Sequence, residues 1–217
     1  DDQFARLLKT LDELKLADNT IVIFTSDHGD MLWSHGYMKK QLPYDEAARV
    51  PFIARGPGVR PGETSDALFT LADLLPTLLG LAGLEKPASV EGTDHSGLLA
   101  GLGDAGKADA ILLANPHSCD EAEMQHLPEW RAVRTHRHLY AERLRGVPWL
   151  LFDCIDDPYQ MNNLIDLPST AAIQQRLASQ LGELLIETND PFLPGDKLFE
   201  RMNLVEAWRD RNERINL

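Results

Sequence analysis

The feature that most constrains the fold is an apolar run of β-branched residues that follows a helical pattern. Phe4, Leu7, Leu8 and Leu11 recur at helical spacing near the start of the chain, which predicts an amphipathic helix. Residues 20–25 then form an apolar run without alternation, as in a strand buried on both faces of a parallel sheet. A helix followed by such a strand is half of a βαβ repeat, so the sequence predicts an α/β fold.

Three further elements are expected before residue 81. The sequence predicts a short helix that begins at Pro43, a strand over 50–54, and a leucine-rich helix over 66–80. Pro76 lies inside the last of these, so we expect a kink there or two shorter helices.

The second half of the chain has a different pattern. Short strands separated by turn residues, as in an antiparallel meander, are expected at 110–114, 130–135, 138–143 and 149–154. A closing helix over 171–187 and a Pro-rich tail follow. We therefore expect residues 1–108 to belong to an α/β core and residues 109–217 to form a small antiparallel α+β lobe. No Pro/Ser/Gly-rich linker of the kind that separates independent domains divides them.

Composition excludes several classes of function. The 217 residues hold 34 acids and 21 bases, a formal charge of −13, which argues against nucleic-acid binding. No apolar stretch approaches the roughly 20 residues of a membrane span. Cys119 and Cys154 are too few for a disulfide framework and lack zinc-like spacing. The chain starts inside a helix, without a signal peptide, so we interpret it as a fragment. The sequence does not indicate an oligomeric state.

The first candidate site is Ser-Asp-His-Gly at residues 26–29, directly after the predicted strand. Ligands of open α/β sheets bind beyond the carboxyl ends of strands. The carboxylate of Asp27 and the imidazole of His28 could both turn toward one cation, with Ca²⁺, Mn²⁺ and Zn²⁺ compatible with these donors. The alternative is an aspartate that caps the next turn beside an incidental histidine.

The loop that follows carries further candidates. Lys39 and Lys40 lie twelve and thirteen residues beyond Asp27, and a lysine there could bind a tetrahedral oxyanion or stabilise charge on a leaving oxygen. His35 either contacts the substrate, supports the residues that bind it, or is an exposed side chain. A solvated lysine is the alternative for the pair.

The chain resembles the sulfatase family of the alkaline phosphatase superfamily. The matching segments, in chain order, are 20–30, His35-Gly36, Lys40, Tyr44-Asp45-Glu46, Arg49-Val50-Pro51, 56–58, 73–77, 130–135 with Tyr140, and 152–164. The resemblance implies an alkaline-phosphatase-like, mostly parallel sheet with flanking helices, followed by the antiparallel lobe. It also implies the hydrolysis of small-molecule or carbohydrate sulfate esters.

In that family a formylglycine residue attacks sulfur, and a divalent cation, usually Ca²⁺, holds the sulfate. By resemblance, Asp27 and His28 match metal ligands, and Lys40 matches the lysine that grips the sulfate and the bridging oxygen. His35 stays a candidate substrate contact. The doubled lysine leaves a one-residue ambiguity, and the spacing favours Lys40. The family also favours a periplasmic or secreted location.

One departure from the family is large. No Cys/Ser-x-Pro-Ser-Arg segment, which would carry the formylglycine, occurs in the 217 residues. We therefore expect the nucleophile and the remaining metal ligands to lie upstream, and these residues alone to be inactive on p-nitrophenyl sulfate.

Two other functions remain open from the sequence. One is a phosphonate monoester or phosphodiester hydrolase of the same superfamily, with Mn²⁺ or Zn²⁺ as its metal, because Asp-His and a downstream lysine serve phosphoryl chemistry too. The other is a non-catalytic pseudoenzyme lobe. The presence of Asp27, His28 and Lys40 together argues against it, because a protein that only binds does not need all three.

Overall fold

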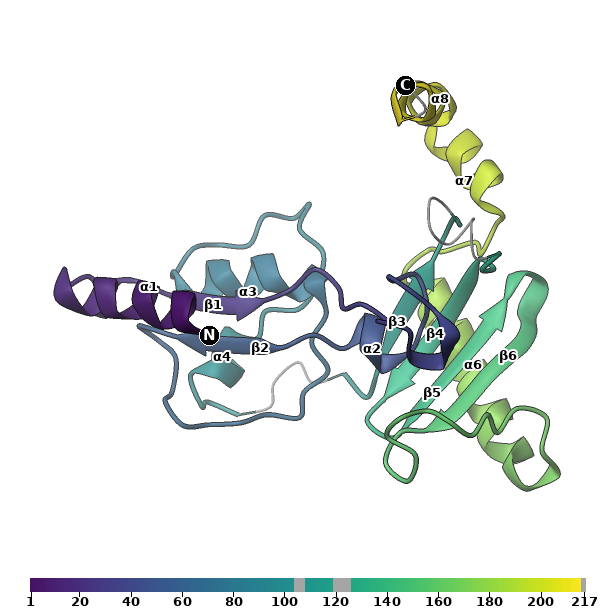
Figure 1. Cartoon of the computed structure of the whole chain (residues 1–217), viewed down its shortest axis with the longest axis horizontal. Helices are drawn as coiled ribbons and strands as arrows, with labels where there is room; N and C mark the ends of the chain where they lie inside the picture. The colour runs from purple at the N-terminus through teal and green to yellow at the C-terminus, as the bar shows by residue number, and fades with distance from the viewer. Residues whose placement is uncertain (104–107, 119–125, 216–217) are drawn as a thin grey trace. The chain divides into compact units, whose positions relative to one another are not determined.

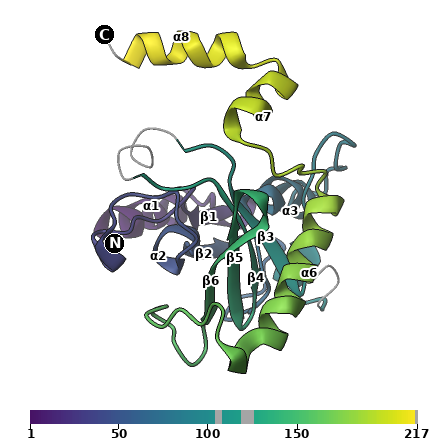
Figure 2. The same ribbon diagram turned by 90° about the vertical axis from the view of Figure 1, so that its right-hand side faces the viewer.

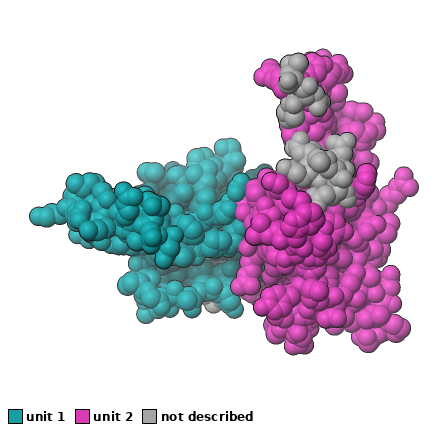
Figure 3. Space-filling view, viewed as in Figure 1, with its two compact units in different colours: residues 1–27, 50–108 teal, residues 28–49, 109–217 magenta. Residues whose placement is uncertain are grey.

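The computed structural model describes residues 1–103, 108–118 and 126–215. They divide into two compact units, one of residues 1–27 and 50–108 and the other of residues 28–49 and 109–217 (Figure 3). Residues 28–49 therefore group with the second half of the chain, whereas the boundary drawn from the sequence places them in the first. The change of unit falls between Asp27 and His28.

The first unit contains a two-stranded sheet (Figure 1). Strand β1 (Val22–Thr25) pairs antiparallel with β2 (Phe52–Arg55), and Thr25 lies opposite Phe52. Most of β1 is half-buried, and Phe24 is 43% exposed. The run predicted to be a strand is one, but its partner within the described residues is antiparallel and it is not buried on both faces.

The predicted first helix is confirmed as α1 (Asp2–Glu13). The ring of Phe4 lies 5.2 Å from that of Phe24 on β1, and Arg55 on β2 forms an ion pair of 2.8 Å with Asp12. These contacts join α1 to the two-stranded sheet of the same unit.

The predicted helix over 66–80 is too long. Helix α3 covers Leu74–Leu81 and follows a 3₁₀ turn at Leu71–Asp73. The carboxylate of Asp73 accepts hydrogen bonds from the backbone and hydroxyl of Thr70, and this capping box sets the start of the helical segment. Pro76 consequently lies in the first turn of α3, where no backbone donor is required, so it causes no break. A short helix, α4 (Ser96–Leu99), follows.

The antiparallel meander of the second unit is confirmed. Its four strands, in the sheet order β3-β4-β5-β6, are β3 (Ala110–Asn115), β4 (Trp130–Thr135), β5 (His138–Arg143) and β6 (Val147–Asp153) (Figure 2). All neighbouring strands pair antiparallel. The turn between β4 and β5 contains His136, and His138 begins β5; burial lowers the pKa of His138.

Each face of this sheet is covered by a different segment. Helix α6 (Ala171–Glu187) packs on one face, where Leu177 and Leu181 join Val133, Tyr140 and Leu151. Alternate residues of the same strands point the other way and bury apolar side chains of the 28–49 segment, which are Met31, Leu42, Tyr44 and Ala47. Because successive side chains of a strand point to opposite faces, the sheet buries α6 on one face and this segment, with its short helix α2 (Asp45–Ala48), on the other.

The chain after α6 is not only a Pro-rich tail. It forms α7 (Gly195–Met202) and α8 (Val205–Ile215), and Figure 2 shows both beyond the sheet. Between α6 and α7, Asp190 forms an ion pair with Arg131 of β4. None of the helices in the described ranges is long and apolar enough to cross a membrane.

Candidate functional site

The segment that carries the candidate residues is a folded-back loop of the second unit. Backbone hydrogen bonds cross it from Gly29 N–H to Ala47 O (2.9 Å), from Met31 N–H to Lys39 O (2.6 Å) and from Trp33 N–H to Tyr37 O (2.9 Å). A Cβ atom at Gly29 would collide with the carbonyl oxygen of Glu46. The close approach of the two arms therefore requires glycine directly after His28.

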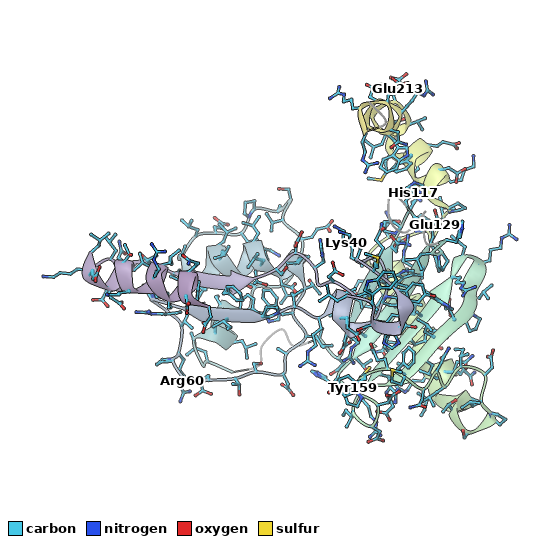
Figure 4. All side chains as sticks on the ribbon, viewed as in Figure 1. Lys40, Arg60, His117, Glu129, Tyr159 and Glu213 are labelled. Atoms are coloured by element: carbon cyan, nitrogen blue, oxygen red, sulfur yellow. The ribbon has the colours of Figure 1, made fainter. Side chains whose placement is uncertain are left out.

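His28 and Lys40 meet across this loop. The Nδ1 atom of His28 lies 2.7 Å from the carbonyl oxygen of Gly29, and its Nε2 atom lies 2.8 Å from Nζ of Lys40, which Figure 4 labels. A carbonyl only accepts and an ammonium only donates, so Nδ1 carries the proton and Nε2 presents its lone pair. The imidazole is therefore neutral, in the tautomer that can ligate a metal through Nε2.

Local backbone geometry distinguishes the two adjacent lysines. Lys39 is exposed and adopts a left-handed conformation with φ of +65°, whereas Lys40 is half-buried and directs its ammonium to His28. The structure thus brings Lys40 next to one member of the predicted Asp-His pair.

Asp27 is the last residue of the first unit's leading segment and is exposed. The hydroxyl of Ser26 lies 3.4 Å from its Oδ1 atom. Among the described residues, no group of three or more His, Cys, Asp or Glu side chains is placed to hold a metal ion.

His35 has a packed environment. Its ring stacks on Tyr44 with centroids 4.1 Å apart, and its Nε2 atom lies 3.6 Å from Glu46 Oε1. Its side chain is only 11% exposed, so the solvated alternative is excluded. Burial, with the nearby Tyr37 and Glu46, raises the pKa of Tyr44 to about 12, and the phenol stays neutral.

Residues of the sheet and of the loop after β6, which no sequence pattern indicated, hold this segment in place. The backbone N–H of Asp45 donates to Gln160 Oε1 at 2.8 Å, and Arg134 Nη2 lies 3.3 Å from Asp45 Oδ2. The indole N–H of Trp130 donates to the carbonyl oxygen of Gln41 at 2.9 Å. The partners are 89 to 115 positions apart in the sequence, so no local pattern could have revealed them.

His117, which follows β3, is packed against aromatic side chains. Its ring packs edge-on against Phe199 and Trp208, and its Nδ1 atom lies 3.4 Å from Glu129 Oε1 (Figure 4). It therefore joins the sheet end to α7 and α8. Cys119 lies outside the described residues.

Comparison with known proteins identifies the family. The model of the sulfatase family matches residues 1–84. The chain is also 36% identical, over 94% of its length, to an ulvan-active sulfatase of Formosa agariphila. The chain belongs to the sulfatase family. It spans about 40% of the length of the curated relatives that it matches.

Solved structures share the fold of this chain. A structure of a protein in complex with its substrate D-glucosamine-2-N,6-O-disulfate matches with a TM-score of 0.78 at 29% identity, over 88% of this chain and 39% of that one. A phosphonate monoester hydrolase of Agrobacterium radiobacter matches with a TM-score of 0.73 at 25% identity, over 86% and 39%. The predicted α/β fold class with an antiparallel lobe is confirmed.

Proposed function

We propose that the loop of His28 and Lys40 forms one side of the active site of an enzyme that hydrolyses sulfate esters. The observation that carries this proposal is the 2.8 Å contact of Lys40 Nζ with His28 Nε2 in a sulfatase-family chain. It brings the ammonium group of Lys40 within hydrogen-bond distance of the nitrogen that we propose as a metal ligand. A sulfate ester carries a permanent negative charge, which a half-buried ammonium group is suited to bind.

We propose that Asp27 and His28 hold a divalent cation, with Ca²⁺ as the family's usual choice. A carboxylate oxygen and a neutral imidazole nitrogen suit such an ion, and the contact of His28 Nδ1 with Gly29 O leaves Nε2 in its ligating form. Two donors are too few for a closed protein site, so further ligands come from outside this pair. When bound, the ion supplies positive charge to the sulfate group.

Lys40 has a separate role in this proposal. The single lone pair on His28 Nε2 serves one partner at a time, so Lys40 and a cation compete for it. A Lys40 that is released from His28 donates to the ester instead. There it stabilises the negative charge that develops on the bridging oxygen as the S–O bond breaks.

The nucleophile comes from outside these residues. We propose a formylglycine, as in the family, because residues 1–217 contain no Cys/Ser-x-Pro-Ser-Arg segment and span about 40% of the matched relatives. Sulfated carbohydrates are the proposed substrates, supported by the ulvan-active relative and by the disulfated glucosamine of the matching structure.

The test uses the full-length protein, with formylglycine verified by mass spectrometry, on p-nitrophenyl sulfate and on sulfated saccharides. We expect turnover, its loss after treatment with a chelator, and its recovery with Ca²⁺. Lys40→Ala should lower kcat by about 100-fold or more, whereas Lys39→Ala, the matched exposed neighbour, should change it little. Absence of turnover, or equal activity of the two variants, would overturn the proposal.

The second candidate is a phosphonate monoester hydrolase, favoured by the match to the Agrobacterium enzyme. The same preparation distinguishes the two when kcat/KM is compared on p-nitrophenyl sulfate and on phenyl phosphonate esters. A higher value on the phosphonate would replace the sulfatase proposal.

A further inference from the structure

The backbone on both sides of Lys40 is held in an unfavourable conformation. Lys39 and Gln41 have φ angles of +65° and +74°, in the left-handed region that residues with a side chain rarely adopt. Such residues persist only where surrounding contacts fix them. The conformation that presents Lys40 therefore depends on what its two neighbours bind.

Both neighbours are held by hydrogen bonds. On one side, Lys39 N–H donates to Asp30 Oδ1 at 3.0 Å, and Lys39 O accepts from Met31 N–H at 2.6 Å. These bonds are local to the loop. On the other side, Gln41 O accepts from the indole Nε1–H of Trp130 at 2.9 Å, and this contact joins the loop to the sheet.

Trp130 is a rigid donor. It begins β4, is 3% exposed, and belongs to the same buried cluster as Leu42, the residue that follows Gln41. Sheet pairing with Asn115 and Arg143 fixes its backbone. The indole is thus held by the core of the second unit, and its N–H fixes the carbonyl of the residue next to Lys40.

We infer that Trp130 is a positioning residue for Lys40, and that its indole N–H holds Gln41 so that the ammonium reaches His28. The inference rests on the proposed function for its catalytic consequence, but its structural part does not. Removal of the N–H leaves the carbonyl of Gln41 without this donor and allows Lys39–Gln41 to leave the left-handed region.

The test is Trp130→Phe in the full-length protein, with Trp149→Phe as the matched control. Trp149 packs against the same buried cluster, but its ring contacts the guanidinium of Arg143. Rates are measured on aryl sulfates whose leaving phenols differ in pKa. Since Lys40 acts on the leaving oxygen, Trp130→Phe should slow the poorest leaving group by about tenfold and the best much less, which corresponds to one lost hydrogen bond.

A purely structural role would give a different result. Equal slowing on every leaving group, or the same profile in Trp130→Phe and Trp149→Phe, overturns the inference. If Trp130→Phe does not fold, β-(3-benzothienyl)alanine introduced at position 130 replaces the N–H by sulfur at nearly constant shape. The same leaving-group dependence is expected of it.

Crystal structures of the two variants separate this inference from the proposed function. In crystals grown without divalent metal or substrate, so that nothing competes for His28 Nε2, we expect Lys40 Nζ to leave His28 Nε2 in Trp130→Phe and to stay in Trp149→Phe, whether or not the protein hydrolyses sulfate. An unchanged Lys40 in Trp130→Phe refutes the positioning role. Lack of activity in the unsubstituted protein refutes the function alone.

Discussion

The ion pair of Arg131 and Asp190 gives the sharpest prediction for stability. Arg131 is 1% exposed, and its guanidinium makes two hydrogen bonds to the carboxylate of Asp190. It also donates to the carbonyl oxygens of Trp130 (3.0 Å) and Asn115 (3.3 Å). Asp190→Ala removes the only carboxylate recorded in contact with this guanidinium among the described residues, and leaves a buried cation with two neutral acceptors.

Loss of one partner of a buried ion pair costs about 3–5 kcal/mol. Because Arg131 keeps its two carbonyl acceptors and a ring contact with Phe192 at 4.8 Å, we expect the lower end, about 3 kcal/mol. The assay is urea unfolding at pH 7, followed by tryptophan fluorescence. Asp156→Ala is the control, since Asp156 forms an ion pair of 2.7 Å with Arg137 but both side chains are exposed, where such pairs contribute little.

The stabilisation by the Arg131–Asp190 pair should be lost at low pH. Burial would raise the pKa of Asp190, but hydrogen bonds from Arg131 and from the Phe192 N–H outweigh burial and hold this pKa below its usual range. The pair's stabilisation is therefore complete above about pH 4, the ordinary pKa of an aspartate, and disappears as pH falls through the lower folded-state pKa. Equal shifts of the urea midpoint in Asp190→Ala and Asp156→Ala would refute this reasoning.

Three further predictions concern the 28–49 segment. Gln160→Leu should destabilise the protein by about 1–3 kcal/mol, because the N–H of Asp45 loses its partner; an unchanged urea midpoint contradicts this. Since the pKa of Tyr44 is raised to about 12, Tyr44→Phe and the unsubstituted protein should give the same absorbance titration at 295 nm up to pH 11. A smaller absorbance rise in the variant below pH 11 contradicts this. Gly29→Ala should destabilise the protein by about 1–3 kcal/mol, because the added Cβ collides with the carbonyl oxygen of Glu46. An unchanged thermal unfolding midpoint contradicts this.

Short-range patterns predicted most of the fold. The strands of the meander and the helix over 171–187 were located within two residues, because period-two and period-3.6 repeats depend only on neighbouring side chains. The helix over 66–80 was too long, since the start signal of Thr70 and Asp73 is local but was outweighed by the leucines. The helices α7 and α8 were missed because prolines before Gly195 suggested a tail.

The candidate site was only partly predictable. The Asp-His pair and the doubled lysine are visible as residue types, and spacing favours Lys40, but the positive φ angles at Lys39 and Gln41 that present Lys40 to His28 were not required by any residue type. The contact of Trp130 with Gln41 joins residues 89 positions apart. Such pairings follow from how the loop packs on the sheet, and only coordinates reveal them.

A crystal structure of the full-length protein with Ca²⁺ and a bound sulfate ester tests the central claim most directly. We expect an ion coordinated by the carboxylate of Asp27 and by His28 Nε2, with Lys40 Nζ moved from His28 to the bridging oxygen of the ester. An ester bound elsewhere, with Lys40 still on His28 Nε2 and no ion at Asp27, would contradict it.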